Sequence, residues 1–388
     1  MTIETDLNVG PLLPLIAAQA ASADETRSVS PAVIAALKAN PVMRMSASRN
    51  LGGLESDMTA IAAELEAVAA ACGSTAWCLW NHLCTFHFFC GLLGPANADQ
   101  LAAITGAGEW VCFPAGAGTG ISGRMEGEAV ILTGVAAFGS GARYADHAGV
   151  VFMPAGEKAP RFTLLPLRSA EVRIDPTWKA MSLRASATDH VHYEGVHTPL
   201  GRVVPFPRRP REGLRDPATP VIHPRYREDW VGLSDLWLGA MAVGVVQAAL
   251  DEACAGIQGR VALMGVKMTE RPTVHVNLGL AGALLANARA GVWSALAAVD
   301  RRIAAGVSPV EADYLSQLAA GMMALRLCDE ALRLILRVLG GAGLREGPSF
   351  ERRYRDFQAM PLHINAHPDR VTEQYGRHLL GLEPENPF

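Results

Sequence analysis

The chain of 388 residues carries little charge for its length and no excess of one sign. Charged residues make up 19% of the sequence, and 34 Lys and Arg are balanced by 38 Asp and Glu. Because domains that bind nucleic acid carry a basic patch or stripe, this balance gives no indication of a nucleic-acid partner. Hydrophobic residues account for 50% of the chain, which favours a helical protein that buries much of its surface.

The sequence also lacks a long apolar run and a basic leader. A membrane-spanning helix needs about 18 to 20 consecutive apolar residues, and the longest candidate, 237–250, is interrupted by Gly239, Gly244 and Gln247. The N-terminal segment MTIETDLNVG contains acidic residues where a secretory signal has basic ones. We therefore predict a cytoplasmic protein with no signal peptide and no membrane partner.

Several catalytic and metal-binding motifs are missing as well. No GxSxG elbow, Walker loop or HExxH helix is present, so hydrolase, NTPase and zinc-protease functions lack support. The seven cysteines are odd in number and have no Cys-x-x-Cys spacing, which argues against a disulfide framework or a zinc site. His363 and His367 have a metal-ligand spacing, but no third ligand accompanies them. We predict buried, reduced cysteines and no metal.

Hydrophobic periodicity divides the chain into three predicted domains, which its length favours over a single core. Residues 1–105 read as helical, and the segment 76–93 is apolar on nearly every face. In residues 106–225, short β-prone runs alternate with Gly, Pro, Asp and Ser, as in a small sandwich or barrel. Residues 226–388 return to long helices that need one another for burial, which predicts a bundle.

The last domain contains three predicted helices without an interrupting proline. They are rich in Ala and Leu and span 230–257, 276–305 and 311–339. Before them, the Arg- and Pro-rich segment 205–215 reads as an exposed linker or surface loop rather than a nucleic-acid-binding patch.

Two short segments place small hydroxyl residues where a ligand could approach the backbone. Residues 73–75 (Gly-Ser-Thr) separate two predicted helices, and the free amino-terminus of the second could bind an anion. In residues 138–141 (Phe-Gly-Ser-Gly), a hydroxyl at a strand end could hydrogen-bond a flat ligand. An ordinary helix cap and a tight turn are the simpler explanations. Trp77 and Trp80 could line an aromatic substrate, although buried helices need such residues for their core.

The segment LGGAGLREGPSFERRYRDFQAMPLH (339–363) contains the densest group of candidate residues. Its glycines Gly340 and Gly341 can adopt backbone angles closed to other residues and let a ligand approach the main chain. A glycine stop after a helix, followed by a solvated charged turn, explains the same pattern.

Cations and a histidine follow these glycines. Arg352, Arg353 and Arg355 lie beside Asp356, an arrangement that suits either a phosphate or internal ion pairs. We favour ion pairing for at least one of the three. His363 could act as an acid, a base or a hydrogen-bond donor beside a ligand.

In this order and spacing, the segments resemble the acyl-CoA dehydrogenase fold and, within it, the flavin-dependent monooxygenases that work with a separate flavin reductase. The resemblance extends from about residue 31 to 382 and is most specific at ACGSTAW (71–77), FGSG (138–141) and RDFQAMPLH (355–363). It implies a mostly α, α+β architecture: an N-terminal helical domain, a central β-barrel and a C-terminal four-helix bundle, assembled as a homotetramer. The RDxxxxxxH frame and the YGRHLLGL ending favour the monooxygenase branch.

This resemblance implies an oxygenase component that receives reduced flavin, FMNH2 or FADH2, from the reductase and uses O2. A C4a-(hydro)peroxyflavin would then transfer one oxygen atom to an aromatic or heteroatom-containing small molecule. The flavin would lie between barrel and bundle, with a neighbouring subunit helping to hold it.

The resemblance also implies roles for particular residues. Ser140 and His363 would act on the flavin, and either His82 or His87 would polarise the substrate. The implied cofactor-binding residues are Ser140, Gly141, Ser186, Thr188, Gly340, Gly341, Arg355 and His363. Two alternatives remain: an acyl-CoA dehydrogenase-type desaturase with tightly bound flavin, and a non-catalytic scaffold of the same fold.

Overall fold

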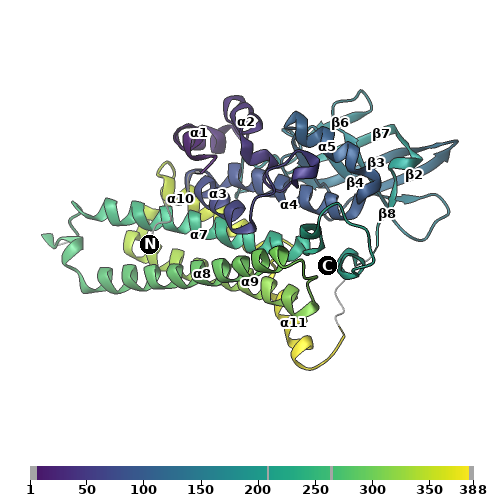
Figure 1. Cartoon of the computed structure of the whole chain (residues 1–388). Coiled ribbons are helices and arrows are strands. Elements are labelled where there is room, and N and C mark those ends of the chain that lie inside the picture. The colour runs from purple at the N-terminus through teal and green to yellow at the C-terminus, as the bar shows by residue number, and fades with distance from the viewer. Residues whose placement is uncertain (1–6, 208, 263–264, 384–388) are drawn as a thin grey trace.

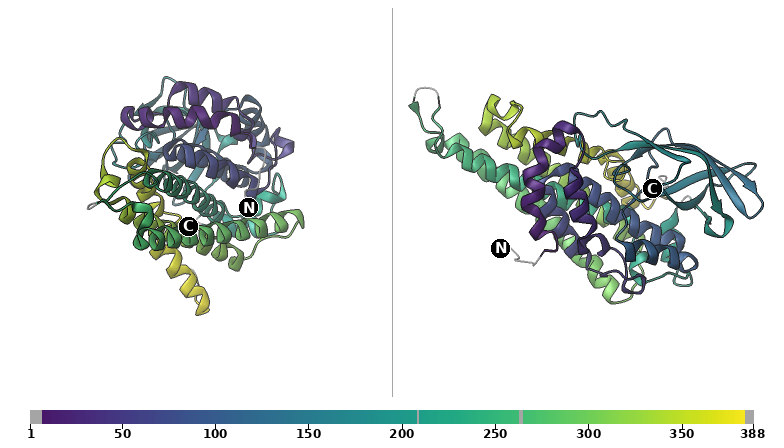
Figure 2. Two further views of the ribbon diagram at one scale, coloured as in Figure 1. Left: turned by 90° about the vertical axis from the view of Figure 1, so that its left-hand side faces the viewer. Right: turned by 90° about the horizontal axis from the view of Figure 1, so that it is seen from above.

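The computed structural model describes residues 7–207, 209–262 and 265–383. A sheet lies at one end of an elongated molecule, and the long helices α7 (Trp230–Ile257), α8 (Pro272–Ala304) and α9 (Glu311–Leu339) extend away from it (Figures 1 and 2). The predicted order of helices, strands and helical bundle is confirmed. The boundaries after residues 105 and 225 stay a prediction. Residues 1–6, which belong to the segment used to predict no signal peptide, lie outside the described residues.

Helix α4 occupies the centre of the N-terminal part. The helices of this part are α1 (Leu13–Thr26), α2 (Pro31–Lys38), α3 (Met58–Ala71), α4 (Gly73–Leu93) and α5 (Ala98–Ala107). Nearly all of α4 is buried, as expected for a segment that is apolar on every face. Space is tight at the turn from α3 into α4, because a Cβ on Gly73 would lie 3.0 Å from the Asp356 carboxyl.

The strands form one sheet in the order β6-β7-β3-β2-β4-β5-β8, with β1 paired to β4. Their bounds are β1 (Val111–Cys112), β2 (Gly120–Glu126), β3 (Ala129–Gly139), β4 (His147–Pro154), β5 (Arg161–Pro166), β6 (Val172–Asp175), β7 (Asp189–Pro199) and β8 (Val204–Pro205). Neighbours are antiparallel except at β1–β4 and β2–β4. Among the described residues, β6 and β8, at the two ends of this order, do not pair with each other.

The bundle matches its prediction closely. Helices α7 and α9 have the predicted bounds, and α8 begins four residues before the predicted 276 and ends one residue before 305. Helix α3 packs along α7, α10 (Ser349–Ala359) packs against α7, and α11 (Pro368–Leu379) packs against α9.

The predicted exposed linker at 205–215 is wrong in its second half. Residues Pro210–Arg215 form helix α6, and Arg211 is only 3% exposed. Its guanidinium lies 4.5 Å from the centre of the Tyr314 ring and faces the carboxylate of Glu311 at 3.7 Å. A cation–π contact and a nearby carboxylate therefore hold this segment against α9. Residue 208 lies outside the described part of the segment.

Two helices, α7 and α8, are long and apolar enough by length and composition to cross a membrane. In α7, 83% of the most apolar window is buried inside the protein, whereas in α8 the figure is 28%. Helix α7 is therefore a core helix, while α8 leaves apolar side chains on the surface of a single chain. All seven cysteines are free and six are buried, as predicted.

Close packing of α7 on α3 predicts a strong effect of adding one methyl group at Gly244. A Cβ there would overlap the backbone carbonyl of Glu66. We expect Gly244→Ala to lower the free energy of unfolding by about 1–3 kcal/mol, because the two helices must separate. Urea denaturation monitored by circular dichroism would measure the change.

Gly256 provides a matched control in the same helix. It is exposed, and no atom lies within 4 Å of an added Cβ. Gly256→Ala should raise the free energy of unfolding by roughly 0.5–1 kcal/mol through helix propensity. Equal effects of the two substitutions would contradict the packing described for Gly244.

Candidate active site

The first turn of α4 and the end of β3 meet in a hydrogen bond between two buried side chains. The indole Nε1 of Trp77 donates to the hydroxyl oxygen of Ser140 over 2.9 Å. Ser140 directly follows β3, where positive φ angles at Phe138 and Gly141 turn the backbone. Only 7% of Ser140 is exposed, so protein groups rather than solvent orient its hydroxyl.

Two further hydroxyls extend from Ser140 into the segment 181–188. Ser140 Oγ lies 3.1 Å from Thr188 Oγ1, which lies 2.8 Å from Ser186 Oγ. The Gly141 N–H donates to the Ser186 carbonyl over 2.8 Å. The structure therefore brings together four candidate residues, Ser140, Gly141, Ser186 and Thr188. We call Ser140, Thr188 and Ser186 the hydroxyl row; its contact with a cofactor stays a prediction.

His363 contacts the same indole from the loop after the short helix η10 (Met360–Leu362). Its ring stands edge-on to Trp77, with centroids 5.6 Å apart, and edge-on to Trp80, with centroids 4.9 Å apart. Ser140 and His363 therefore share one neighbour, Trp77, although they lie far apart in the sequence.

Packing against the indoles keeps His363 uncharged. Desolvation and, to a smaller extent, the Arg370 cation lower the pKa of His363 to about 4, so the imidazole is neutral at pH 7. Its Nδ1 accepts the N–H of Asn365 over 3.3 Å, which leaves the ring proton on Nε2. The ring can thus donate one hydrogen bond to a ligand without adding a charge.

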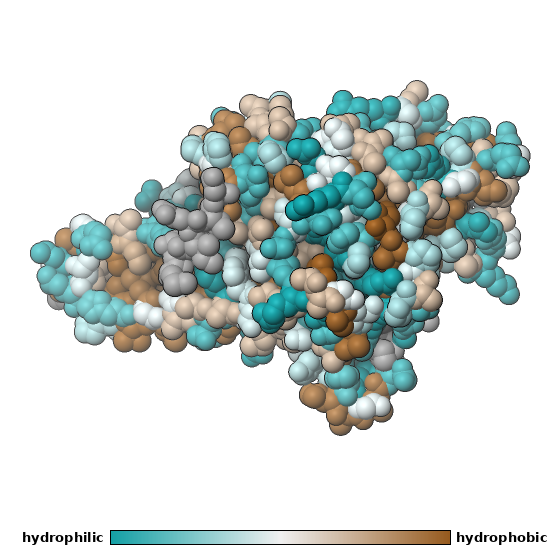
Figure 3. Space-filling model, viewed as in Figure 1, coloured by the Kyte–Doolittle hydropathy of each residue, from teal (hydrophilic) through white to brown (hydrophobic). Residues whose placement is uncertain are grey.

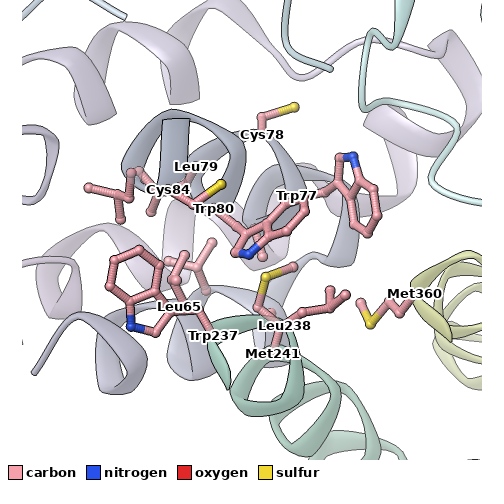
Figure 4. Close-up of a cluster of buried hydrophobic side chains, with 14 of the residues drawn as sticks. Leu65, Trp77, Cys78, Leu79, Trp80, Cys84, Trp237, Leu238, Met241 and Met360 are labelled. Atoms are coloured by element: carbon pink, nitrogen blue, oxygen red, sulfur yellow. The ribbon is translucent and has the colours of Figure 1, made fainter. Parts of the chain in front are cut away.

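The indoles of Trp77 and Trp80 belong to a cluster of apolar side chains from three elements (Figure 4). Besides these two residues of α4, the cluster contains Leu238 and Met241 of α7 and Met360 of η10. Trp80 Nε1 donates to the backbone carbonyl of Ser234 over 2.9 Å, and Asn365 Nδ2 lies 3.1 Å from the hydroxyl of Ser234. These bonds fix the loop that carries His363 to α7.

The substrate-polarising role expected of His82 has no geometric support. Its Nε2 lies 2.9 Å from the carbonyl of Met43, and its Nδ1 accepts the N–H of Val111 over 3.0 Å. Both ring nitrogens are therefore used by the backbone, and the ring connects α4 to β1. Desolvation also lowers the pKa of His82 to about 4.

The alternative, His87, lies too far along α4 to serve the same site. Ten residues separate it from Trp77, which is about 15 Å along a helix. Its Nε2 donates to the carbonyl of Glu228 over 3.1 Å. Sequence reasoning chose these two histidines because both follow the helix start, but neither faces His363.

Asp356, the acidic residue of the RDxxxxxxH frame, holds the segment that carries the hydroxyl row. Its Oδ1 accepts the N–H of Leu183 over 2.7 Å. It is 2% exposed, and desolvation raises the pKa of Asp356 to about 7. A positive φ of 47° at Leu183 and at Ala187 bends this segment toward Ser140.

The predicted cofactor contact of Arg355 conflicts with its partners. Its guanidinium pairs with Asp24 at 2.8 Å and with Glu351, and it donates to the Met181 carbonyl over 2.7 Å. Arg353 donates to a backbone carbonyl of α3 and lies 3.6 Å from the carboxylate of Glu252. Ion pairing, rather than phosphate binding, accounts for these two cations.

Gly340 and Gly341 lie far from Ser140 within one chain. They are exposed at the end of α9, next to Arg260, which donates to the carbonyl of the preceding Leu339 over 3.1 Å. Helix α9 has 29 residues, so its end lies about 40 Å from its start beside α11. A cofactor held by Ser140 therefore does not reach these glycines of the same chain.

Sequence reasoning missed Ser234 and Asn365, and it considered Trp77 only as a substrate-lining or a core residue. A buried indole N–H needs an acceptor, so the position of Trp77 on the first turn of a buried helix was a usable signal. Ser234 and Asn365 carried none, since serine and asparagine are common in helices and loops.

Residues 236–368 of the chain match a protein-family model described as acyl-CoA dehydrogenase, C-terminal domain. The chain is 26% identical over 366 residues to an indole-3-acetate monooxygenase of Pseudomonas putida, covering 93% of this chain and 90% of that protein. It is 25% identical to the oxygenase subunit HsaA, a flavin-dependent monooxygenase of Rhodococcus jostii, covering 96% and 97% of the two chains.

Solved structures show the same fold over nearly the whole chain. XiaF from a Streptomyces species, in complex with FADH2 and glycerol, has a TM-score of 0.88 at 22% identity and covers 97% of this chain and 95% of its own. FMN-bound TdsC, a dibenzothiophene monooxygenase of a Paenibacillus species, has a TM-score of 0.85 at 17% identity, with 97% of each chain covered.

The chain is therefore a protein of acyl-CoA dehydrogenase-like fold. Within that fold it is a homologue of the oxygenase components of two-component, flavin-dependent monooxygenases. The fold is the predicted one, and the similar proteins are flavin-dependent monooxygenases, the branch that the sequence predicts.

The raised pKa of Asp356 predicts a pH dependence of stability. An unfolded aspartate titrates near 4, whereas burial raises the pKa of Asp356 to about 7. Between pH 4 and pH 7, Asp356 keeps its proton in the folded chain and loses it in the unfolded chain. The free energy of unfolding should therefore fall as pH rises from about 4 to about 7, and this contribution should be constant above pH 7.

The variant Asp356→Asn keeps an acceptor for the Leu183 N–H but cannot titrate. Between pH 5 and pH 8, wild type should lose on the order of 2 kcal/mol more stability than the variant. Denaturant unfolding at four pH values measures this difference, and parallel profiles for the two proteins would refute the buried, protonated state of Asp356.

Proposed function

We propose that this chain is the oxygenase component of a two-component monooxygenase. It takes reduced FMN or FAD from a separate reductase and uses O2 to oxygenate an aromatic or heteroatom-containing small molecule. The observation that carries the proposal is that Ser140 and His363 both contact Trp77, between the sheet and the helices. We further propose that the chain is cytoplasmic.

The residues around Trp77 fit a flavin ring, which is flat and has hydrogen-bonding groups along its edge. The hydroxyl row supplies small donors and acceptors at the end of β3. The indoles of Trp77 and Trp80 supply flat apolar surfaces, and the neutral His363 supplies one donor. Ser140, Thr188 and His363 would hold the edge of the ring.

Bound reduced flavin supplies the electrons that activate O2, and the chain supplies orientation and shielding. Ser140 accepts from Trp77 and keeps hydrogen-bonding capacity for the cofactor. His363 donates from Nε2 toward an oxygen atom that gains negative charge, without carrying a charge of its own. The buried side chains Trp80 and Met360 exclude water, which would otherwise divert oxygen to hydrogen peroxide.

The acidic residues near this loop do not suit the desaturase alternative. Removal of a proton beside a thioester carbonyl needs a free carboxylate base. Glu373 is exposed on α11, and the carboxyl of Asp356 is committed to the Leu183 N–H. The side chain facing Trp77 is instead a neutral histidine, which favours the monooxygenase.

We also propose a homotetramer in which a neighbouring chain completes the cofactor site. Apolar side chains remain exposed along α8 and on α11, among them Val276 at 68% and Leu380 at 76%; Figure 3 shows hydrophobic surface at the lower edge, over these helices. Exposed apolar patches of this kind are typical of subunit interfaces. Gly340 and Gly341, remote from Ser140 in their own chain, would then contact the flavin of a neighbour.

Loss of either polar contact to the cofactor should uncouple oxygen consumption from product formation. We expect Ser140→Ala and His363→Ala each to lower the ratio of product to hydrogen peroxide by about tenfold, the effect of one lost hydrogen bond. An oxygen electrode and a peroxide assay, run with NADH, a flavin reductase and substrate, measure the ratio.

Ser122 on β2 offers a matched serine control, because it is exposed and bonds only a neighbouring strand. Ser122→Ala should keep the wild-type ratio. Unchanged coupling in both site variants would remove the assignment of Ser140 and His363. A protein that is yellow as purified and reduced by acyl-CoA would instead support the desaturase, and one that binds no reduced flavin would support the scaffold.

The tetramer predicts a solution mass of four chains of 41.1 kDa each. Val276→Glu places a charge on the exposed apolar face of α8 and should shift the mass toward smaller species, because burying an unpaired charge is unfavourable. Size-exclusion chromatography with light scattering tests this, with Met125→Glu on β2 as an exposed control. A wild-type monomer would contradict the proposal.

A further inference from the structure

Asn81, one turn after Trp77 on α4, is a buried amide whose acceptor oxygen is unused. It is 8% exposed, and its Oδ1 has no hydrogen-bond partner among the described residues. The hydroxyl of Thr85, one turn further on, donates to the Asn81 backbone carbonyl over 2.6 Å and so leaves the amide alone. Because burial of an amide oxygen without a donor is unfavourable, an unpaired one in a folded interior indicates a partner that arrives from outside the chain.

The contacts of its neighbours on α4 fix the direction in which Asn81 points, since successive residues of a helix are about 100° apart. On one side of the helix, Cys78 Sγ donates to the carbonyl of Ser186 in the hydroxyl row. On the other side, Trp80 Nε1 donates to the backbone of α7. Asn81 lies about 40° from Trp77 around the helix, between these two directions. Asn81 and Trp77 therefore both face the boundary between the sheet and the bundle.

The solvent-accessible surface that remains on this part of α4 belongs to the same two residues. Within residues 76–83, Trp77 is 6% exposed and Asn81 is 8% exposed, whereas every other side chain is at most 1% exposed. Ser140, which accepts from Trp77, keeps 7%, and His363 is partly exposed. The accessible surface is thus gathered around Trp77, and a ligand that covers it comes within reach of the Asn81 amide.

Aromatic rings close the far end of this face of α4. Phe88, seven residues after Asn81, packs against Trp230 and Phe113 with ring centroids 4.6 Å and 5.5 Å apart. Along the helix axis, Asn81 lies about 6 Å from Trp77, and Phe88 lies about 16 Å from it. A single ring placed against Trp77 therefore has its edge at Asn81, before the closed end is reached.

We propose that Asn81 is a specificity-determining residue, whose Oδ1 accepts a hydrogen bond from an N–H or O–H group at the edge of the substrate ring. The inference rests on the proposed function and adds a residue to that site. A neutral amide oxygen suits an uncharged donor of this kind. A molecule of the same shape without the donor leaves the buried oxygen unpaired, and sites built around such a hydrogen bond reject that molecule.

Isothermal titration calorimetry of the full chain, with saturating oxidised FMN and in parallel oxidised FAD so that no turnover occurs, tests the proposal. The probes are three pairs of equal shape in which one member lacks the donor: indole with benzofuran, phenol with fluorobenzene, and 2-naphthol with 2-fluoronaphthalene. In at least one pair, the donor should bind about tenfold more tightly than its partner, because the partner cannot make the hydrogen bond.

Asn81→Leu removes the amide and keeps a side chain of similar size. In the pair that shows the preference, it should weaken the donor about tenfold and change the partner less than about twofold, so that the preference disappears. Asn81→Ala removes the same amide and serves if the leucine variant does not fold. It should abolish the preference as well, although both probes then lose packing contacts.

Thr105 on α5 provides a matched control, because it is 4% exposed and its hydroxyl donates to the Leu101 carbonyl of its own helix over 2.9 Å. Thr105→Val also removes a buried polar group and should keep the preference. The proposal is overturned if no donor binds better than its partner, or if the preference persists without the Asn81 amide. A preference that depends on Asn81 in a chain that oxygenates nothing would contradict the proposed function alone. Oxygenation without any such preference would contradict this inference alone.

Discussion

The hydrogen bond from Trp77 to Ser140 is the contact on which the candidate site depends. It joins the first turn of a buried helix to the turn that ends β3, two elements that otherwise belong to different parts of the fold. A buried indole N–H needs an acceptor, so the bond fixes both the helix and the hydroxyl. The hydroxyl row continues from Ser140, and His363 packs on the same indole. Sheet, central helix and C-terminal loop thus meet at one ring.

Charge is kept one layer away from that ring. Arg355 is neutralised by Asp24 and Glu351, and Asp356, whose pKa burial raises to about 7, is bonded to the backbone. The two polar groups described beside Trp77 are a hydroxyl and an uncharged imidazole. Because these protein groups are uncharged, any charge that develops during the reaction would lie on the bound cofactor and O2. Fixed hydrogen-bond donors interact strongly with such a charge where water is excluded.

Long-range contacts decide what could be predicted from the sequence. The bounds of α7 and α9 followed from apolar periodicity without proline, whereas two glycines and two charged residues hide the alternation of β2. The resemblance paired Ser140 with His363, which spacing alone could not do. It could not separate His82 from His87, because their roles depend on backbone partners distant in sequence. The remoteness of Gly340 required the path of α9 through space.

A crystal structure grown anaerobically with reduced flavin tests the central claim most directly. The account predicts the flavin ring beside Trp77, with one edge within hydrogen-bonding distance of Ser140 and the Nε2 of His363 facing the ring, as fixed donors at a reacting centre require. A flavin bound elsewhere, with the Trp77–Ser140 contact closed to it and His363 turned away, would contradict the account.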